Sequence, residues 1–575
     1  MHFVKKEPTT EEERLAKEKQ RAVKLGKYLT ARNRIFEKNR AEEFDEELLL
    51  LTQAVLSKNP DISTFWNLRR KTIDLMIHNL TGKDDSAKEL NRLLNAEMGL
   101  THECLMQANP KSYGAWHHRG WTLERFISTG LEADFKSELA LCKKALDFDC
   151  RNFHCWDHRR IVSKLAKCTD EEELGFSLDR INHNFSNYSA WHYRSVLLPR
   201  VQLTNTGSPS LDEALLNEEL EKIANAFSCD PEDQSAFVYA RWLLSLDSSK
   251  TFMHSSSSDP PLPLSITFNG RKTVIVMSKA AKMEEILQFV QISDQNLLIP
   301  LSTASVKPRS AVVWELRATQ KFLSRLDSGD EWVYSDSLVN TKRMKIAYDC
   351  DINRAETLVA RTLMAKLEEL MSIPPISAWT KYTYALCLME LNPVKHHSKI
   401  VEILGELAGS MDCKRRELYK AIISRLTICH TLREETDGRS LLDKILEGEE
   451  NCLNLQRKGI TSLSGIEFLA GFLETLILGE NELRDLNDIL LPRLENLTVS
   501  ENPITSIPAL PCLHGLKSLN IAGTAVSSLD SIVSGLKALP NLEKLIICET
   551  AVVEDVPQLH EHLGNTNVRI INYWL

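Results

Sequence analysis

The sequence of 575 residues lacks the patterns that mark secreted, membrane-spanning or nucleic-acid-binding proteins. Its 13 cysteines include no C-x-x-C pair and no regular framework, which indicates reduced thiols rather than a disulfide scaffold. Basic and acidic residues number 70 and 79, and the net charge of −9 argues against a general nucleic-acid binder. No window reaches the roughly 18 consecutive apolar residues that a membrane span needs.

Recognisable catalytic motifs are lacking as well. The chain has no phosphate-binding G-x-x-x-x-G-K-[ST] loop, no dinucleotide fingerprint, no H-E-x-x-H pair and no nucleophile elbow. His117 and His118 are adjacent and cannot both face one metal from a helix, so we expect the histidines of this motif to form hydrogen bonds between helices. The N-terminal residues are charged and contain no apolar segment, so we expect no signal peptide and a cytoplasmic protein.

The sequence does contain a repeat, in which an aromatic residue is followed three or four positions later by arginine. Two copies read FWNLRR and YGAWHHRGW, and successive copies are 50, 40, 35 and 46 residues apart. Short turns such as ANPKSY and FDCRN separate the helical segments between them. The aromatic positions are Trp66, Trp116, Trp156, Trp191 and Phe237, and the arginines are Arg69, Arg119, Arg159, Arg194 and Arg241.

This repeat predicts a stack of helical hairpins, an α-solenoid, over residues 9–246. One hairpin cannot bury its apolar face alone, so stacked copies share a core. Residues three or four apart lie on one face of a helix. We therefore expect the aromatic ring to be buried between hairpins and the arginine to lie along the seam, where Glu or Asp residues of the first helices can pair with it.

Residues 247–350 predict a small β-rich insert. The loop SSSSDPPLPLS is followed by the short runs SITFNG, KTVIVMS and SAVVWELR, which are typical of strands. Trp314 and Arg317 imitate the repeat motif, but the valines before Trp314 favour a strand. Helical periodicity returns over residues 351–448, where Trp379 marks a degenerate further repeat. The insert is therefore expected to interrupt the solenoid.

Residues 449–575 carry a second kind of repeat, the leucine-rich repeat. Four segments fit L-x-x-L-x-L-x-x-N with tolerated substitutions and start 21, 22 and 26 residues apart: LETLILGEN, LENLTVSEN, LKSLNIAGT and LEKLIICET. Each should add one strand to a horseshoe, with Asn481 or Asn502 satisfying backbone groups in the turn. LNLQRKGI and VRIINYW are interpreted as the terminal copies. The predicted fold class is mainly α: a solenoid of helical hairpins with a small β-rich insert and a C-terminal leucine-rich repeat domain.

Lys111 differs from other charged residues in its position, because it stands just before a predicted helix start. Free backbone N–H groups and the positive end of the helix dipole favour an anion there. Tyr113 adds a hydroxyl two residues on, and Arg151 occupies the matching position of the next repeat, on the same rim. The residues suit a diphosphate contact, and a solvated lysine at a helix start is the alternative that spacing alone leaves open.

The helical repeat resembles that of protein prenyltransferase alpha subunits, whose mark is an aromatic residue, then tryptophan, then arginine on the second helix. The resemblance covers roughly residues 25–246, with four good copies and one weak copy. The combination of these repeats with an insert and a leucine-rich C-terminus resembles the Rab geranylgeranyltransferase (type II) branch of the family. The resemblance implies an enzyme subunit that is inactive without its beta partner. That partner would hold the zinc and the lipid pocket, with geranylgeranyl diphosphate at the subunit interface.

Particular residues match the family's motif. In the family, the lysine and tyrosine of K-[NS]-Y-x-x-W-H-H-R reach the diphosphate, which implies this role for Lys111 and Tyr113. The aromatic residue and histidine of the next repeat lie near the active-site rim. Here they are Phe153 and His154, and Phe153 lacks the hydroxyl of the tyrosine in farnesyl-type subunits. A histidine near the N-terminus can approach the zinc, and His2 matches it, although a disordered tail is the simpler expectation.

The resemblance also implies the partners. Rab GTPases would arrive bound to a Rab escort protein that docks on the helical region, and their C-terminal cysteines would receive geranylgeranyl as thioethers. Two alternatives stay open: a non-enzymatic scaffold in which both repeat regions bind proteins, and a farnesyl-type alpha subunit with extra domains that needs no escort protein. The spacing of 35 to 50 residues argues against a scaffold of strict 34-residue tetratricopeptide repeats.

Overall fold

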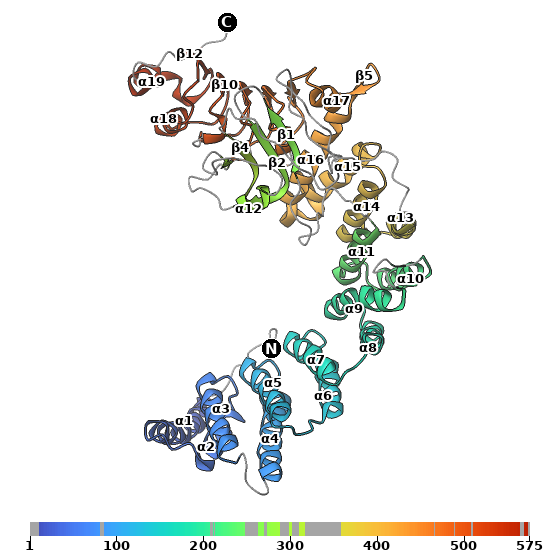
Figure 1. Ribbon diagram of the computed structural model, residues 1–575, viewed down its shortest axis with the longest axis vertical. Helices are drawn as coiled ribbons and strands as arrows, with labels where there is room; N and C mark the ends of the chain where they lie inside the picture. Colours follow the sequence, from blue (N-terminus) through green and yellow to red (C-terminus); the bar gives the residue numbers. More distant parts are fainter. Residues whose placement is uncertain are drawn as a thin grey trace. The chain divides into compact units, whose positions relative to one another are not determined.

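The structure is a computed structural model, and the chain divides into two compact units, Met1–Leu211 and Asp212–Leu575 (Figure 1). His2 lies outside the described residues. Among the helices that are described, none has the length and apolarity needed to cross a membrane. The structure describes residues 11–80, 86–206, 211, 213–247, 263–268, 273–287, 298–301, 310–316, 358–464, 466–487, 489–507, 510–563 and 568–572.

The first unit is a stack of helical hairpins. Its helices are α1 Glu11–Arg40, α2 Glu46–Leu56, α3 Ser63–Leu80, α4 Ser86–Glu103, α5 Tyr113–Ser128, α6 Phe135–Phe148, α7 Phe153–Leu165, α8 Asp170–His183 and α9 Tyr188–Thr206. Helices α2 and α3, α4 and α5, α6 and α7, and α8 and α9 pack in pairs, and α5 also contacts α3 and α7 of the neighbouring pairs. Figure 1 shows these pairs following one another along the chain.

Helices α5 and α7, the second helices of their pairs, begin where a polar side chain caps them. Ser112 accepts a hydrogen bond from the backbone N–H of Ala115 at the start of α5. Asn152 does the same for Cys155 at the start of α7. These caps satisfy N–H groups that have no partner within the helix, so they fix where each second helix starts.

The aromatic residues of the repeat are buried between the hairpins, as predicted. The indole of Trp66 donates to the carbonyl of Pro60 at 2.8 Å, and Trp116 donates to the carbonyl of Pro110 at the same distance. Each ring thus fills the core and also satisfies a carbonyl of the turn before its own helix. The buried set consists of Trp66, Trp116, Trp156, Trp191 and Phe237.

The repeat arginines Arg69, Arg119 and Arg159 form buried ion pairs between helices. Arg69 of α3 donates to Glu97 of α4 at 2.9 Å, and His118 of α5 donates to the same carboxylate at 2.8 Å. One glutamate therefore joins three helices and two hairpins. The same arrangement recurs with Arg119, Glu138 and His158, and with Arg159, Glu173 and Tyr193. We call these sets the seam triads. They confirm the predicted pairing and the hydrogen-bonding role of the motif histidines.

The second unit begins with helices that continue the hairpin pattern. These helices are α10 Glu213–Cys229, α11 Gln234–Asp247, α13 Leu358–Met371, α14 Ala378–Leu391, α15 His397–Glu406, α16 Arg416–Arg433 and α17 Leu441–Leu446. Helix α11 contacts α13 and α14 although the insert separates them in sequence. Arg241 lies over the rings of Trp379 and Tyr382, at 5.5 and 5.4 Å, instead of forming the acidic pair expected from the repeat. The reason is that an aromatic helix returns beside it after the insert.

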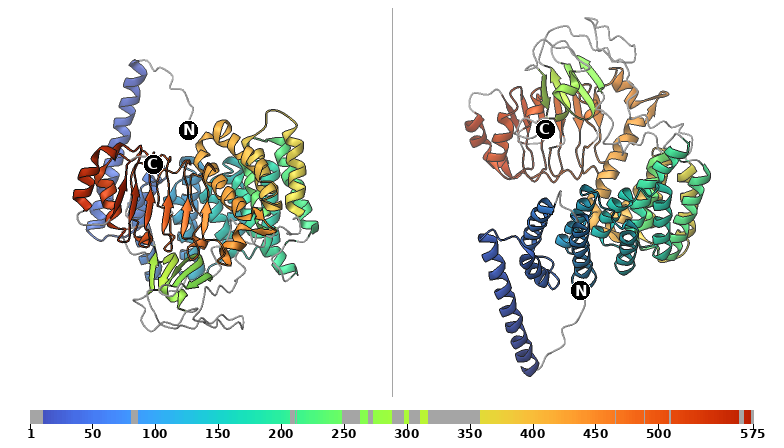
Figure 2. Two further views of the ribbon diagram at one scale, coloured as in Figure 1. Left: turned by 90° about the horizontal axis from the view of Figure 1, so that it is seen from above. Right: turned by 60° about the horizontal axis from the view of Figure 1, so that its bottom comes forward.

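The insert contains an antiparallel sheet, in strand order β1-β2-β4-β3. Its strands are β1 Pro263–Phe268, β2 Thr273–Lys282, β3 Leu298–Leu301 and β4 Ser310–Leu316, and the short helix α12 Met283–Ile286 follows β2. Trp314 lies in β4, so the strand interpretation is confirmed. The buried side chains of Val274, Val276 and Val313 belong to one core with those of the leucine-rich repeats. Figure 2 shows the green insert strands beside that domain.

The leucine-rich repeats form a parallel sheet, seen in Figure 2 as orange to red strands side by side. The turn asparagines are buried: Asn481 accepts from the N–H of Ile460 at 2.9 Å and donates to the carbonyl of Leu455, as predicted. The predicted fold class is thus confirmed. The strands are β7 Cys452–Asn454, β8 Thr475–Ile477, β9 Asn496–Thr498, β10 Ser518–Asn520, β11 Lys544–Ile546 and β12 Arg569–Ile571, with α18 Leu529–Lys537 and α19 Val556–Leu563.

Candidate functional site

The candidate site is an exposed group of side chains at the starts of α5 and α7, in the first unit. It comprises Lys111, Tyr113, Asp149, Phe153 and His154, and we call it the rim cluster. Its members come from two neighbouring turns, the one between α4 and α5 and the one between α6 and α7. The contact between α5 and α7 brings these turns together. Four of the five residues were predicted from the sequence, and Asp149 was not.

A turn that recurs in the hairpins sets the position of Lys111. The side-chain oxygen of Asn109 accepts a hydrogen bond from the backbone N–H of Lys111 at 2.9 Å. In the next hairpin Asp149 accepts in the same way from the N–H of Arg151 at 3.1 Å. Such turns form because the short Asn or Asp side chain reaches the backbone two residues on. Lys111 and Arg151 therefore occupy equivalent places on the rim.

Lys111 and Asp149 form an ion pair, with 2.9 Å between the Lys111 Nζ and the Asp149 Oδ2. The lysine side chain is 66% exposed and the aspartate 26%, so the carboxylate is the more fixed partner. Burial acts to raise the pKa of Asp149, but the bonds from Lys111 and the backbone of Arg151 outweigh it and hold that pKa below its ordinary value. The carboxylate is therefore charged at neutral pH.

The three aromatic members of the rim cluster contact one another: Tyr113 lies edge to face with the other two, and Phe153 is tilted by 37° against His154. The ring centroid of Tyr113 lies 4.1 Å from that of His154, at an interplanar angle of 80°, and 6.0 Å from that of Phe153. Tyr113 is 71% exposed and Phe153 is 53% exposed. Large exposed rings that gather in one place are typical of a surface that another molecule covers. Burial lowers the pKa of His154, so its imidazole is neutral at pH 7.

The guanidinium of Arg151 reaches the following turn of the stack. Its Nη2 donates to the backbone carbonyl of Ser186, in the following turn, at 2.7 Å. The sequence placed Arg151 correctly at the equivalent position of the next repeat. The structure shows that its side chain bonds to the next turn along the stack, and its charge helps to lower the pKa of Asp149.

The seam triads lie beneath the rim and hold the helices that carry it. Burial alone would raise the pKa of Glu97, but the hydrogen bond from His118 and the charge of Arg69 outweigh it and lower that pKa to about 2. Burial also lowers the pKa of His118, so a neutral imidazole donates to a charged carboxylate. The buried charges of Arg69 and Glu97 therefore balance within their triad. The rim cluster, in contrast, is an exposed group of cationic and aromatic side chains.

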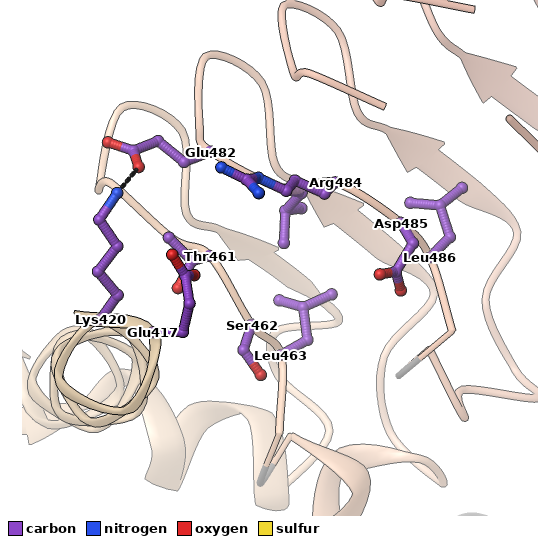
Figure 3. A pocket seen from close by; sticks show the side chains of 10 residues that line it. Glu417, Lys420, Thr461, Ser462, Leu463, Glu482, Arg484, Asp485 and Leu486 are labelled. Carbon is purple, nitrogen blue, oxygen red and sulfur yellow. Dashed lines mark hydrogen bonds and ion pairs between the residues drawn. The ribbon is translucent and has the colours of Figure 1, made fainter. Parts of the chain in front are cut away.

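A recess lies in the second unit, between α16 and the first leucine-rich repeats. It has a volume of about 200 Å³, and Figure 3 shows Lys420 of α16 pointing toward Glu482, with 2.5 Å between the Nζ and the carboxylate. Glu417, Arg484 and Asp485 also line it. Acidic and basic groups are mixed there, so the recess favours no single class of ligand. Across the described parts of the chain, no three His, Cys, Asp or Glu residues gather as metal ligands.

Comparisons with known proteins support one family. The model of the protein prenyltransferase alpha subunit repeat matches residues 94–126, 135–165, 170–201 and 216–247. The chain is 31% identical to "Geranylgeranyl transferase type-2 subunit alpha" of Homo sapiens over 567 residues, which cover 95% of this chain and 91% of that protein. This chain belongs to the alpha-subunit family of type-2 geranylgeranyl transferases. It is thus a member of a prenyltransferase subunit family.

Other members of the family give the same assignment. The Sus scrofa protein of the same name is 31% identical over 586 residues, 98% of each chain. The Saccharomyces cerevisiae member is also 31% identical, over 252 residues that cover 43% of this chain and 73% of its own length. The match to the mammalian members therefore includes the insert and the leucine-rich repeats.

Asp149 is the rim residue that was not predicted from the sequence, because it belongs to the turn before α7 and not to the family motif. A signal was nevertheless present in the sequence. The equivalent turn position is an asparagine in the neighbouring turns, Asn109 and Asn184, and a carboxylate only in the turn that faces Lys111 among these three. A change from amide to carboxylate opposite a lysine indicates an ion pair.

Proposed function

We propose that this chain is the alpha subunit of a heterodimer that transfers geranylgeranyl from its diphosphate to C-terminal cysteines of Rab GTPases. The beta subunit would hold the zinc and the lipid pocket, and the solenoid would wrap it. The described residues of this chain offer no set of zinc ligands, which is why the proposal assigns the metal to the partner. A zinc ion there supplies the thiolate form of the cysteine.

The reaction determines what the rim cluster has to do. A bond forms between the cysteine sulfur and C1 of the prenyl group, the bond from C1 to oxygen breaks, and diphosphate leaves with the electron pair. Negative charge thus accumulates on the leaving group, where a nearby cation stabilises the transition state. Lys111 provides an ammonium group and Tyr113 a hydroxyl, at the start of α5 where the helix dipole is positive.

The observation that carries the proposal is the exposure of Lys111 and Tyr113 together on one turn. Both residues reach beyond the chain's own core, with side chains 66% and 71% exposed. A residue that serves only the solenoid is buried in the seam, as Arg119 is. Groups that project from the stack in this way suit a ligand held by a second subunit, so the reaction centre is proposed to lie between the two.

Substrate delivery is proposed from the family resemblance. Rab GTPases would reach the heterodimer bound to a Rab escort protein docked on the helices, in the cytoplasm. His154 and Phe153 would then border the lipid diphosphate, and Arg151 would contribute charge from the adjacent turn. His2 would approach the zinc of the beta subunit.

The test is transfer by the heterodimer. This chain is co-expressed with a prenyltransferase beta subunit, and labelled geranylgeranyl incorporation into a Rab is measured with and without escort protein. Lys111→Ala should lower the rate of transfer about tenfold or more, because a donor to the developing charge is lost. Lys58→Ala is the matched control: Lys58 precedes a turn of the first hairpin and is 80% exposed, but lies outside the rim cluster.

The results separate the competing functions. Escort-dependent transfer that falls in Lys111→Ala and not in Lys58→Ala supports the proposal. Normal transfer by Lys111→Ala would remove the diphosphate role and leave the subunit role intact. Transfer to short C-terminal peptides without escort protein would favour the farnesyl-type alternative. Absence of any complex with a beta subunit would favour the scaffold.

A further inference from the structure

Neighbouring turns of the first unit are linked by a side chain that reaches back along the rim. The amide of Asn109 donates to the carboxylate of Asp61 in the preceding turn at 2.9 Å. In the next pair of turns the roles are exchanged, since the carboxylate of Asp149 accepts from Lys111 at 2.9 Å. Each link joins the first residue of one turn to the third residue of the turn before it.

The negative charge of Asp149 is not needed to form its own turn. Its Oδ1 accepts from the backbone N–H of Arg151 at 3.1 Å. In the following turn Asn184 makes the equivalent bond to the N–H of Ser186 at 3.0 Å. An asparagine therefore builds this turn as well as an aspartate does. The second oxygen of Asp149, which faces Lys111, calls for a different explanation.

A carboxylate is also unfavourable where a diphosphate is proposed to bind, because like charges repel. The pairing with Lys111 offers a compensating benefit. Lys111 has a flexible four-carbon stem that is 66% exposed, so its ammonium group would otherwise sample many positions. Asp149 is held by its bond to the Arg151 backbone and is only 26% exposed, so it can serve as a fixed anchor.

We propose that Asp149 is a positioning residue, which holds the ammonium of Lys111 at the rim in the place where the leaving diphosphate is stabilised. The inference rests on the proposed function above and names the residue that prepares it. A lysine ammonium has three N–H donors. One is directed to Asp149, and two remain for phosphate oxygens. Fixing a charged donor before the reaction reduces the reorganisation that the transition state would otherwise require.

The proposal predicts a particular pattern in the kinetics of Asp149→Asn. The amide preserves the turn and removes the charge. With its anchor weakened, Lys111 should stabilise the transition state less, so kcat falls about threefold to tenfold. The KM for geranylgeranyl diphosphate should stay level or fall, because a repelling carboxylate is removed while the lysine is still present. A purely structural role would not separate the two constants in this direction.

The experiment uses the heterodimer and measures kcat and KM for Asp149→Asn, Asp149→Glu, Asp230→Asn, Lys111→Ala and the double variant of Lys111→Ala with Asp149→Asn. Asp149→Glu keeps the charge and should recover part of the lost kcat. Asp230→Asn is the matched control, because Asp230 forms the same turn with the N–H of Glu232 at 3.1 Å and has no lysine partner among the described contacts. In the Lys111→Ala background, Asp149→Asn should have no further effect on transfer, since Asp149 acts through Lys111.

The outcomes distinguish this inference from the proposed function. An equal loss caused by Asp149→Asn in the presence and absence of Lys111 would overturn the positioning role, and so would an unchanged kcat. Failure of Asp149→Asn to assemble with the beta subunit, with Asp230→Asn assembling normally, would show a structural role and overturn it as well. Normal transfer by Lys111→Ala would instead reject the diphosphate role on which the inference rests.

Discussion

The hairpins of residues 11–206 and the leucine-rich repeats of residues 452–571 both stack small units into one body, and they connect these units by different bonds. Each helix satisfies its own backbone N–H and C=O groups, so neighbouring hairpins are joined by side chains. The seam triad of Glu97 with Arg69 and His118 is such a joint, and its members are buried.

The leucine-rich repeats are joined by the backbone itself. Strands β8 and β9 pair in register, with Leu476 opposite Leu497, and the bonds of the ladder run between repeats. In the buried turns, side chains add neutral hydrogen bonds, as where Asn502 accepts from the N–H of Leu483 at 3.0 Å. The buried side-chain joints in these turns are therefore neutral, and the ion pairs between repeats, such as Arg493 with Glu474 and Lys517 with Glu495, are at least partly exposed. The buried joints of the hairpins are ionic.

This difference explains where each region tolerates change. A buried ionic joint depends on three particular side chains at once, whereas a strand ladder depends on the backbone geometry of every turn. The exposed turns between hairpins do not take part in the seam triads. One of them can therefore carry Lys111 and Tyr113 while the equivalent turn of the first hairpin carries Asp61.

The largest effect is expected from breaking an ionic joint. Glu97→Ala leaves Arg69 buried without its counter-charge and removes the partner of His118. The free energy of unfolding should fall by about 3 to 5 kcal/mol. Urea denaturation of the full chain, with hydrogen exchange of peptides from α4 and α5, measures the loss and locates it.

The control for this change is Glu89→Ala on the same helix. Glu89 pairs with Arg92 on the surface, where both side chains are substantially exposed. Such pairs contribute about 0 to 1 kcal/mol. A loss of similar size for Glu97→Ala and Glu89→Ala would contradict the view that the seam triads hold the hairpins together.

Acid should weaken the hairpins more than the leucine-rich repeats. The pKa of Glu97 is about 2 in the folded state against an ordinary 4.5, so the unfolded chain binds the proton first as the pH falls. The stabilisation is complete above about pH 4.5 and is lost between there and about pH 2. The difference of 2.5 in pKa corresponds to about 3 kcal/mol. His118, whose pKa burial lowers, adds a loss that begins as the pH falls through 6.5.

Denaturation at pH 7.5, 5.5 and 3.5, followed by hydrogen exchange in each region, checks this expectation. Peptides from α4 to α7 should lose protection before peptides from β8 to β10, whose asparagine joints do not titrate. The slope of stability against pH should be smaller in Glu97→Gln. Simultaneous loss in both regions, with the slope unchanged in Glu97→Gln, would show that the seam triads do not control acid stability.

The sequence predicts the individual helices and strands well because each depends on the spacing of residues that are close in the chain. The Trp-x-x-Arg pattern places the ring and the arginine on one helix face, and the β-branched run around Trp314 identifies a strand. The spacing of residues within one helix cannot show which later helix packs against it. Arg241 leaves the pattern because α14, with Trp379 and Tyr382, packs against α11 after the insert.

The candidate site was predictable to the same degree. Lys111 and Tyr113 follow from a helix start and from the family motif, which are both local. Asp149 lies 38 residues from Lys111, and their contact depends on the offset between consecutive hairpins. The identity of Glu97 as the partner of Arg69 depends on the same offset. The sequence gives the kind of residue that pairs, and the packing of the hairpins selects which one.

A smaller loss of stability is expected when the buried hydrogen bonds of a leucine-rich turn are removed. Asn502→Ala removes a bond accepted from Leu483 and bonds donated to Leu478 and Val499, in a buried turn. The free energy of unfolding should fall by about 2 kcal/mol. Asn496→Ala is the control, since Asn496 is exposed on β9 and donates only to Thr475 at 3.3 Å among the described contacts. Protection of β8 and β9 against hydrogen exchange reports the loss.

A different result for Asn502→Ala would revise the comparison. A loss as large as that of Glu97→Ala would show that the leucine-rich repeats depend on side-chain joints as strongly as the hairpins do. A loss no larger than that of Asn496→Ala would show that the strand ladder holds the turn without the asparagine.

The smallest effect tests the backbone geometry of one leucine-rich turn. Gly523 has a φ of +65°, and a Cβ there would meet the carboxylate of Glu501. Gly459 has a φ of +66° with open space around its Cβ position. Alanine in this conformation costs about 1 kcal/mol at either site. Gly523→Ala should therefore cost slightly more than Gly459→Ala in urea denaturation.

The difference between the losses of unfolding free energy in Gly523→Ala and Gly459→Ala measures the cost of the contact with Glu501. In the double variant Gly523→Ala with Glu501→Ala, the contact is absent and the loss should return to that of Gly459→Ala. Glu501 itself has a φ of 54°, so Glu501→Gly should stabilise the chain by up to about 1 kcal/mol. If the backbone makes the joints of this region, the free energy of unfolding should fall most in Gly523→Ala, fall less in the double variant and rise in Glu501→Gly. If Glu501→Gly destabilises the chain instead, then the Glu501 side chain contributes to the joint, and this turn resembles the hairpin seams more closely than its neutral ladder indicates.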